Sequence, residues 1–154
     1  MKAKRWAWIF GILSFGMIAF IWCHSVMSRE ASSGESLSVL SMLTPLLNAL
    51  GIKDAESFHG ALRKIAHFVE FGALGTFVGG FTVNLGRIKG QRYISLPLLM
   101  VLAVAVVDEY IQLFSGRAAM VQDVALDFCG GLAGLAFAGL CWLLVRKKLR
   151  KEEL

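Results

Sequence analysis

Side chains that can transfer protons or bind anions occur inside, or directly before, long apolar stretches of this sequence. They are Arg63, His67, Glu70, Asp108, Glu109, Gln112, Asp123 and Asp127. A carboxyl or imidazole group can act as a general acid or base, and a guanidinium can hold a phosphate through two parallel hydrogen bonds. A charge at membrane depth costs about 2.5–3.5 kcal/mol even on an insertion scale, so such residues usually face a bundle interior and mark function.

The spacing of these residues places them on shared helix faces. His67 follows Arg63 by four residues and precedes Glu70 by three, and residues three or four apart are neighbours on a helix. Asp127 follows Asp123 by four residues. Gln112 follows Asp108 by four residues and Glu109 by three. We therefore expect three helices to present polar faces to one another.

Four apolar runs can supply these helices. They cover residues 6–23, 65–83, 95–114 and 124–145, and each approaches or exceeds the ~20 residues that a membrane-spanning helix needs. Apolar residues make up 56% of the chain and charged residues 18%, which is too apolar for a soluble fold of 154 residues to bury. We predict one all-α domain over residues 1–154, an integral membrane four-helix bundle, and exclude a soluble globular enzyme.

Lys and Arg are concentrated on one side of the predicted membrane. Eleven of the 16 lie before the first run, between the second and third, and after the fourth, while the other five lie on the opposite side. Positively charged loops usually face the cytoplasm, so we predict that both termini are cytoplasmic. The net charge of +5 then reflects a basic face against anionic lipid headgroups, and we predict no nucleic-acid partner.

Two further predictions concern the first run and the long loop that follows it. Lys2, Lys4 and Arg5 make the first run resemble a signal peptide, but no small-x-small cleavage site follows, so we expect a retained helix. Residues 24–64 form the long outer loop. Leucines between Leu37 and Leu50 recur at near-helical spacing, which favours a short amphipathic helix on the outer interface or a helix that caps the bundle.

The polar residues of the three spans fall at similar depths. At 1.5 Å per residue, Glu70, Asp108 and Asp127 lie roughly 5–9 Å from the outer ends of their spans. Glycine stripes, Gly75 and Gly79 in one span and Gly130 and Gly134 in another, lie below them and favour close helix approach. We therefore expect a polar cluster at the outer mouth of a tightly packed bundle.

Two stretches resemble the signatures of the VanZ-like family. The first is residues 63–75, RKIAHFVEFGALG, and the second is residues 108–117, DEYIQLFSGR, followed by Asp123 and by glycines from Gly130. The resemblance covers nearly the whole chain and implies a bacterial envelope protein with four helices in the cytoplasmic membrane. The namesake contributes to resistance to the glycopeptide teicoplanin. Asp127 stands where the family more often has Asn, which adds a titratable group.

These considerations give two sets of site residues. The candidate catalytic residues are Glu109, Glu70, His67 and Asp127. The candidate substrate-binding residues are Arg117, Arg63, Gln112, Asp108 and Asp123. Glu109 is the preferred acid or base, and its alternative role is a buried ion pair with Arg117 or Arg63. For Asp123, a helix N-cap is favoured over chemistry.

Two functions follow as hypotheses. The first is binding of an anionic envelope lipid or lipid-linked cell-wall precursor in the outer leaflet and, in its stronger form, modification of it. The second is a non-catalytic protein that alters antibiotic access or binds a partner, with buried charges that serve helix packing; a proton-coupled carrier is a weaker third. His67, Glu70, Glu109 and Asp127 are types of metal ligand, but no His-x-x-x-His or Cys pair accompanies them, so we predict no metal site. The sequence does not identify a cofactor.

Overall fold

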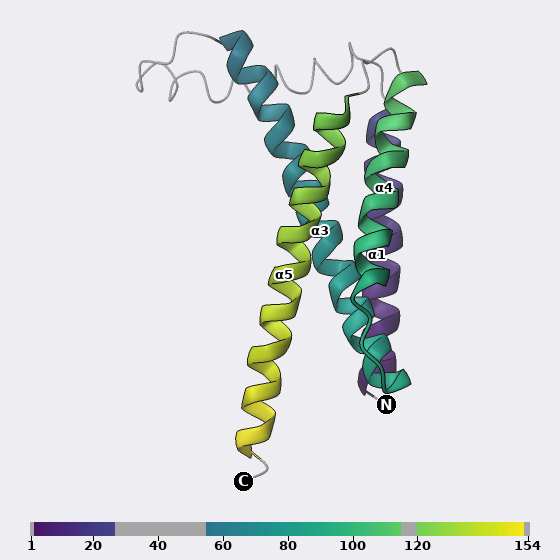
Figure 1. The fold of residues 1–154 in the computed structure, drawn as a ribbon, viewed down its shortest axis with the longest axis vertical. Coiled ribbons are helices and arrows are strands. Elements are labelled where there is room, and N and C mark those ends of the chain that lie inside the picture. The colour runs from purple at the N-terminus through teal and green to yellow at the C-terminus, as the bar shows by residue number, and fades with distance from the viewer. Residues whose placement is uncertain (1, 27–54, 115–119, 153–154) are drawn as a thin grey trace.

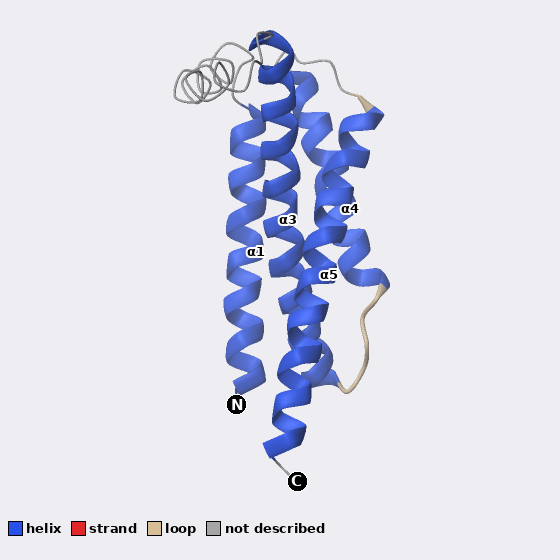
Figure 2. Ribbon diagram, turned by 90° about the vertical axis from the view of Figure 1, so that its left-hand side faces the viewer, coloured by secondary structure: helices blue, strands red, loops and turns tan. Residues whose placement is uncertain are grey.

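The computed structural model describes residues 2–26, 55–114 and 120–152, and this part of the chain is built from helices (Figures 1 and 2). The helices are α1 (Lys2–Val26), α3 (Ala55–Lys89), α4 (Ser95–Phe114) and α5 (Val121–Glu152). All four are long and apolar enough to cross a membrane. The predicted all-α fold with four membrane-spanning helices is therefore confirmed.

The bundle is organised around α3, which contacts the three other helices. α3 crosses α5 (Figure 1), and α1 and α4 each contact α3 and also contact each other. The N-terminal end of α1 and the C-terminal end of α5 lie at the same end of the bundle (Figure 1). This arrangement agrees with termini on one side of a membrane, and which side that is stays a prediction.

The apolar core lies between α1, α3 and α4. Its buried residues are Ile21, Phe71, Leu74, Val78, Val101, Val104 and Ala105. Large apolar side chains also cover the outside of the bundle; Trp8 is 76% exposed and Phe15 is 75% exposed. A water-soluble protein rarely exposes apolar surface so extensively, so these side chains are suited to contact lipid chains.

A glycine seam joins α3 to α5. We use this name for Gly72 and Gly75 of α3 and Gly130, Gly131 and Gly134 of α5. A Cβ atom at Gly75, Gly130 or Gly134 would collide with the backbone of the facing helix. Thr76 reinforces the seam, since its hydroxyl donates to the carbonyl oxygens of Gly72 at 2.9 Å and Gly134 at 3.4 Å. The predicted close approach along the glycine stripes is confirmed.

α1, α3 and α5 extend beyond the apolar runs that predicted them, whereas α4 has the predicted bounds. α3 begins at Ala55, ten residues before the predicted span and inside the predicted outer loop, and α5 continues to Glu152 rather than ending at 145. Hydropathy marks only the part of a helix suited to hydrocarbon, whereas polar residues such as Arg146 and Lys147 can continue the same helix into water. The amphipathic helix predicted between Leu37 and Leu50 lies outside the described residues.

Candidate functional site

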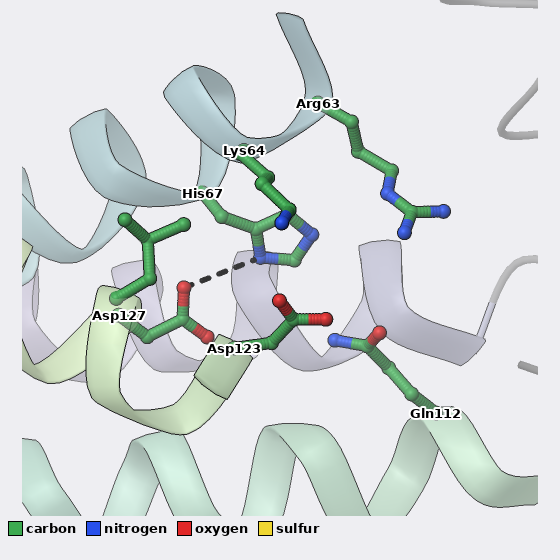
Figure 3. A pocket seen from close by; sticks show the side chains of 7 residues that line it. Arg63, Lys64, His67, Gln112, Asp123 and Asp127 are labelled. Atoms are coloured by element: carbon green, nitrogen blue, oxygen red, sulfur yellow. Dashed lines mark ion pairs between the residues drawn. The ribbon is translucent and has the colours of Figure 1, made fainter. Parts of the chain in front are cut away.

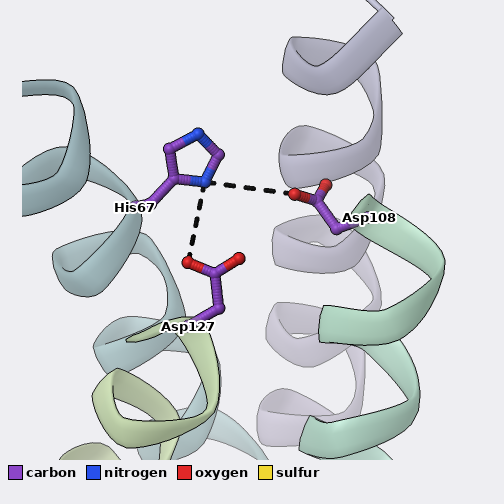
Figure 4. A group of neighbouring side chains, drawn as sticks. All are labelled: His67, Asp108 and Asp127. Atoms are coloured by element: carbon purple, nitrogen blue, oxygen red, sulfur yellow. Dashed lines mark ion pairs between the residues drawn. The ribbon is translucent and has the colours of Figure 1, made fainter. Parts of the chain in front are cut away.

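Three polar side chains from three helices meet in the bundle interior. His67 of α3 lies between Asp108 of α4 and Asp127 of α5 (Figure 4). Its Nδ1 atom is 4.0 Å from Asp108 Oδ2 and 3.8 Å from Asp127 Oδ1. His67 is 8% exposed, Asp108 0% and Asp127 1%, so the group, which we call the buried triad, is shielded from solvent.

Asp108 is held in place by hydrogen bonds from two directions. The hydroxyl of Ser25 in α1 donates to Asp108 Oδ1 at 2.6 Å, and the amide Nε2 of Gln112 donates to Asp108 Oδ2 at 2.8 Å. Hydrogen bonds to a charged group are shorter and stronger than neutral ones. Asp108 therefore links α1 to α4 and has a fixed orientation toward His67.

Asp127 has a different environment. Both of its carboxylate oxygens are buried, and neither has a hydrogen-bond partner among the described residues. Within the described residues, Asp127 makes an ion-pair contact with His67. A buried carboxylate normally has hydrogen bonds or a compensating charge, because removing it from water is costly. Asp127 is thus the least satisfied polar group of the buried triad.

Two residues of α1 that the sequence analysis did not select contribute to this region. Ser25 binds Asp108, as described above. His24 lies with its Nδ1 atom 3.3 Å from Glu70 Oε1, and its ring stacks on that of His67 at a centroid distance of 6.3 Å. Both lie at the outer end of the first apolar run, at the depth of the other polar groups, and this position was the signal that could have identified them.

Glu109 of α4 follows Asp108 in the chain and contacts the residue that precedes α5. Its Oε1 atom accepts a hydrogen bond of 2.7 Å from the backbone N–H of Met120. The Met120 carbonyl accepts the first hydrogen bond of α5, from the N–H of Asp123 at 2.9 Å. The buried Glu109 carboxylate therefore satisfies a free donor at the N-terminus of α5, where the helix dipole favours negative charge.

This geometry corrects the role predicted for Asp123. α5 begins at Val121, so Asp123 lies inside its first turn and Met120 stands at the N-cap position. The apolar run, from which the start of the helix was predicted, begins three residues later than the helix itself. Asp123 instead adds a negative charge to the first turn and lines a pocket.

A narrow pocket adjoins His67 and Asp127 of the buried triad (Figure 3). Its volume is about 10 Å³, which is the space of roughly one water molecule. It is lined by Arg63, Lys64, His67, Gln112, Asp123, Leu126 and Asp127. Lys64 is exposed and Arg63 is half-buried, so two basic side chains lie at the rim while His67 and Asp127 lie inside.

The structure thus sorts the predicted site residues into distinct places. His67, Asp108 and Asp127 form the buried triad, and Gln112 binds Asp108. Arg63 and Asp123 line the pocket, whereas Glu70 pairs with His24 and Glu109 contacts α5. Arg117 lies outside the described residues. The arrangement offers a proton-exchanging or cation-binding interior beneath a rim that can hold an anion.

The VanZ/LLP1 family model matches residues 10–144 of this chain. Neither the curated proteins nor the solved structures contain a match to this chain.

Proposed function

Because the chain belongs to the VanZ/LLP1 family, we propose that it is a cell-envelope membrane protein that binds an anionic lipid or lipid-linked cell-wall precursor at the pocket. The family match covers 135 of its residues, from 10 to 144. The proposal includes a cytoplasmic location of both termini, which puts the pocket in the outer leaflet of the bacterial cytoplasmic membrane. It also includes a contribution to teicoplanin resistance, the property associated with the family's namesake.

The observation that carries the proposal is the position of two cations at the rim of a polar pocket in an otherwise apolar bundle. Arg63 and Lys64 both line the pocket, and they belong to the N-terminal part of α3, which lies away from the chain termini (Figure 1). A guanidinium matches the geometry of a phosphate group, and an ammonium adds a point charge beside it. A lipid phosphate at the membrane surface could bind both while its acyl chains contact the apolar outer surface of the bundle.

In the stronger form of the proposal, the bound headgroup is also modified. His67 and Asp127 lie directly inside the rim and can accept or return a proton. The pocket as it stands holds about one water molecule, so a headgroup would bind at the rim and present one hydroxyl or phosphate oxygen toward His67.

The test compares the lipids that copurify with matched variants. Arg63→Gln/Lys64→Gln removes both rim charges, and Lys89→Gln/Arg92→Gln removes two charges at the opposite end of the bundle. Mass spectrometry of the wild type and the second variant is expected to detect an anionic lipid class that the first variant has lost. The same lipids at the same stoichiometry in all three proteins would contradict the proposal.

A second candidate function, a non-catalytic envelope protein, is favoured by the bonding of Asp108. Its two carboxylate oxygens accept hydrogen bonds from Ser25 and Gln112, which is also what a purely structural polar link between helices requires. This function predicts that Asp108→Leu/Asp127→Leu preserves teicoplanin resistance in cells, while deletion of residues 37–50 abolishes it. The first proposal predicts that the double substitution abolishes resistance.

A further inference from the structure

We propose that the buried triad binds one divalent transition-metal ion and that this ion is zinc or one of its chemical neighbours. His67 Nδ1 and one carboxylate oxygen each of Asp108 and Asp127 are the ligands, and these atoms all lie within 4.8 Å of one another (Figure 4). The ligands come from α3, α4 and α5, so the ion would join three helices. The inference holds whether or not a lipid binds at the pocket rim, and with the ion bound His67 and Asp127 would act as ligands in place of the proton transfer described above.

The first argument for a cation is that the buried carboxylate of Asp127 lacks hydrogen bonds. This carboxylate is 1% exposed, and neither oxygen has a hydrogen-bond partner among the described residues. One of them, Oδ1, points toward the same imidazole nitrogen that faces Asp108. A divalent cation between the three groups would coordinate this oxygen and offset the cost of burying the charge.

The charge of the group also fits a divalent ion. Two carboxylates and a neutral imidazole carry a total charge of −2, which a divalent cation neutralises. A neutral group is much less costly than a net charge in an apolar interior. With the ion bound, the positive charges of Arg63 and Lys64 at the rim would no longer be offset by the two carboxylates below them.

The surroundings of the ligands have the form of a metal site's supporting shell. Ser25 and Gln112 donate to Asp108 at 2.6 and 2.8 Å, and such partners orient a coordinating carboxylate and tune its affinity. Asp108 Oδ2 retains a lone pair for a metal because a carboxylate oxygen accepts in two directions. Stacking on His24 restrains the ring of His67.

The donor set and the dimensions select the kind of ion. Ca²⁺ and Mg²⁺ prefer oxygen ligands alone, whereas an imidazole with carboxylates suits zinc and its neighbours. In a tetrahedral zinc site with bonds of roughly 2.0–2.1 Å, the ligand atoms are about 3.3 Å apart. The two distances from His67 Nδ1 are 3.8 and 4.0 Å, and all three ligand atoms lie within 4.8 Å of one another, so the ligands must move together by roughly 0.5–1.5 Å to reach this value. Three protein ligands leave one coordination position open, and the adjoining pocket has room for one water molecule.

The test measures zinc in the purified full-length protein. The wild type in detergent is stripped with a chelator, incubated with Zn²⁺, desalted and analysed by mass spectrometry of the metal. About one zinc per chain is expected for the wild type and for Asp123→Asn, which alters a carboxylate lining the same pocket. Asp127→Asn and His67→Gln should bind less than a tenth as much. No retained zinc in the wild type, or equal zinc in all four proteins, would overturn the inference.

A second measurement on the wild type does not depend on the folding of a variant. X-ray absorption at the zinc edge should show one imidazole nitrogen and carboxylate oxygens at about 2.0–2.2 Å. Sulfur at about 2.3 Å would assign the zinc to Cys23, Cys129 or Cys141 and overturn the inference. Ser25→Ala should retain the same ligands but weaken affinity about tenfold, the effect expected for an outer partner of a ligand.

Discussion

The carboxylate of Glu109 binds the backbone N–H of Met120 at 2.7 Å, so the last turns of α4 cap the first turn of α5. The two residues are separated by eleven positions in the chain. This contact fixes the start of α5, and with it the first turns from which Asp127 reaches the buried triad. Glu109, for which the sequence predicts acid–base chemistry, therefore also has a structural role.

Substitutions of Glu109 separate these two roles. Glu109→Ala should lower the free energy of unfolding in detergent by about 1 kcal/mol, the usual effect of losing a helix cap. Glu109→Gln keeps an acceptor oxygen and should retain most of the stability. If Glu109 serves as a cap alone, Glu109→Gln also keeps teicoplanin resistance in cells. Loss of resistance with normal stability would instead support its predicted acid–base role.

Removal of the Ser25 hydroxyl should destabilise the bundle. In Ser25→Ala, the fully buried Asp108 loses one of its two donors, and a hydrogen bond to a charged group contributes about 1.5–3 kcal/mol. The matched control is Ser14→Ala, because Ser14 is also buried in α1 but donates to the Phe10 carbonyl of its own helix at 2.8 Å. Chemical unfolding of both variants should show the larger loss for Ser25→Ala. Equal losses of unfolding free energy in the two variants would show that the bond from Ser25 to Asp108 contributes no more to stability than the bond from Ser14 to its own helix.

Gly134 of the glycine seam should tolerate no side chain. A Cβ at Gly134 would collide with the backbone of Gly72, and backbone cannot rotate away as a side chain can. Gly134→Ala should therefore lower stability by about 1–3 kcal/mol or more. Gly139→Ala lies on the same helix with open space around the new atom, and it should be neutral or stabilise by up to about 1 kcal/mol. Comparable thermal unfolding midpoints for the two variants would contradict close packing of α3 on α5.

Labelling of single cysteines tests the predicted orientation. In a background with Cys23, Cys129 and Cys141 replaced by Ala, Gln122→Cys lies at the pocket end of α5 and Gln91→Cys at the end that holds the termini. Both positions are exposed. A membrane-impermeant maleimide applied to spheroplasts should label only Gln122→Cys, and Gln91→Cys only after lysis. The reverse result would place the pocket on the cytoplasmic side.

The sequence predicts the helices and the depth of the polar groups because both depend on local properties. Apolar runs locate the spans, and small residues four apart locate the helix contact at Gly130 and Gly134. Helix ends are less predictable, since residues such as those from 55 to 64 form helix without being apolar. Asp123 illustrates the consequence, because its predicted cap role depended on where α5 begins.

The grouping of polar side chains depends on helix rotation, which a single span does not reveal. Asp108 and Glu109 are adjacent, and the sequence indicates only that they point in different directions. Packing decides that Asp108 turns toward His67 and Glu109 toward Met120. The sequence analysis did not choose Ser25 and His24 as site residues, because a serine or histidine at the end of a span is common. Only a partner on another helix shows that such a residue belongs to a polar site.

The glycine seam also limits how this protein can evolve. Contacts between side chains can drift, because a larger residue on one helix is compensated by a smaller one on its neighbour. Where backbone faces backbone, as between Gly134 and Gly72, there is nothing smaller to substitute. A mutation at such a position has no single-step compensation, so the distance between α3 and α5 tolerates less change than a contact made by side chains.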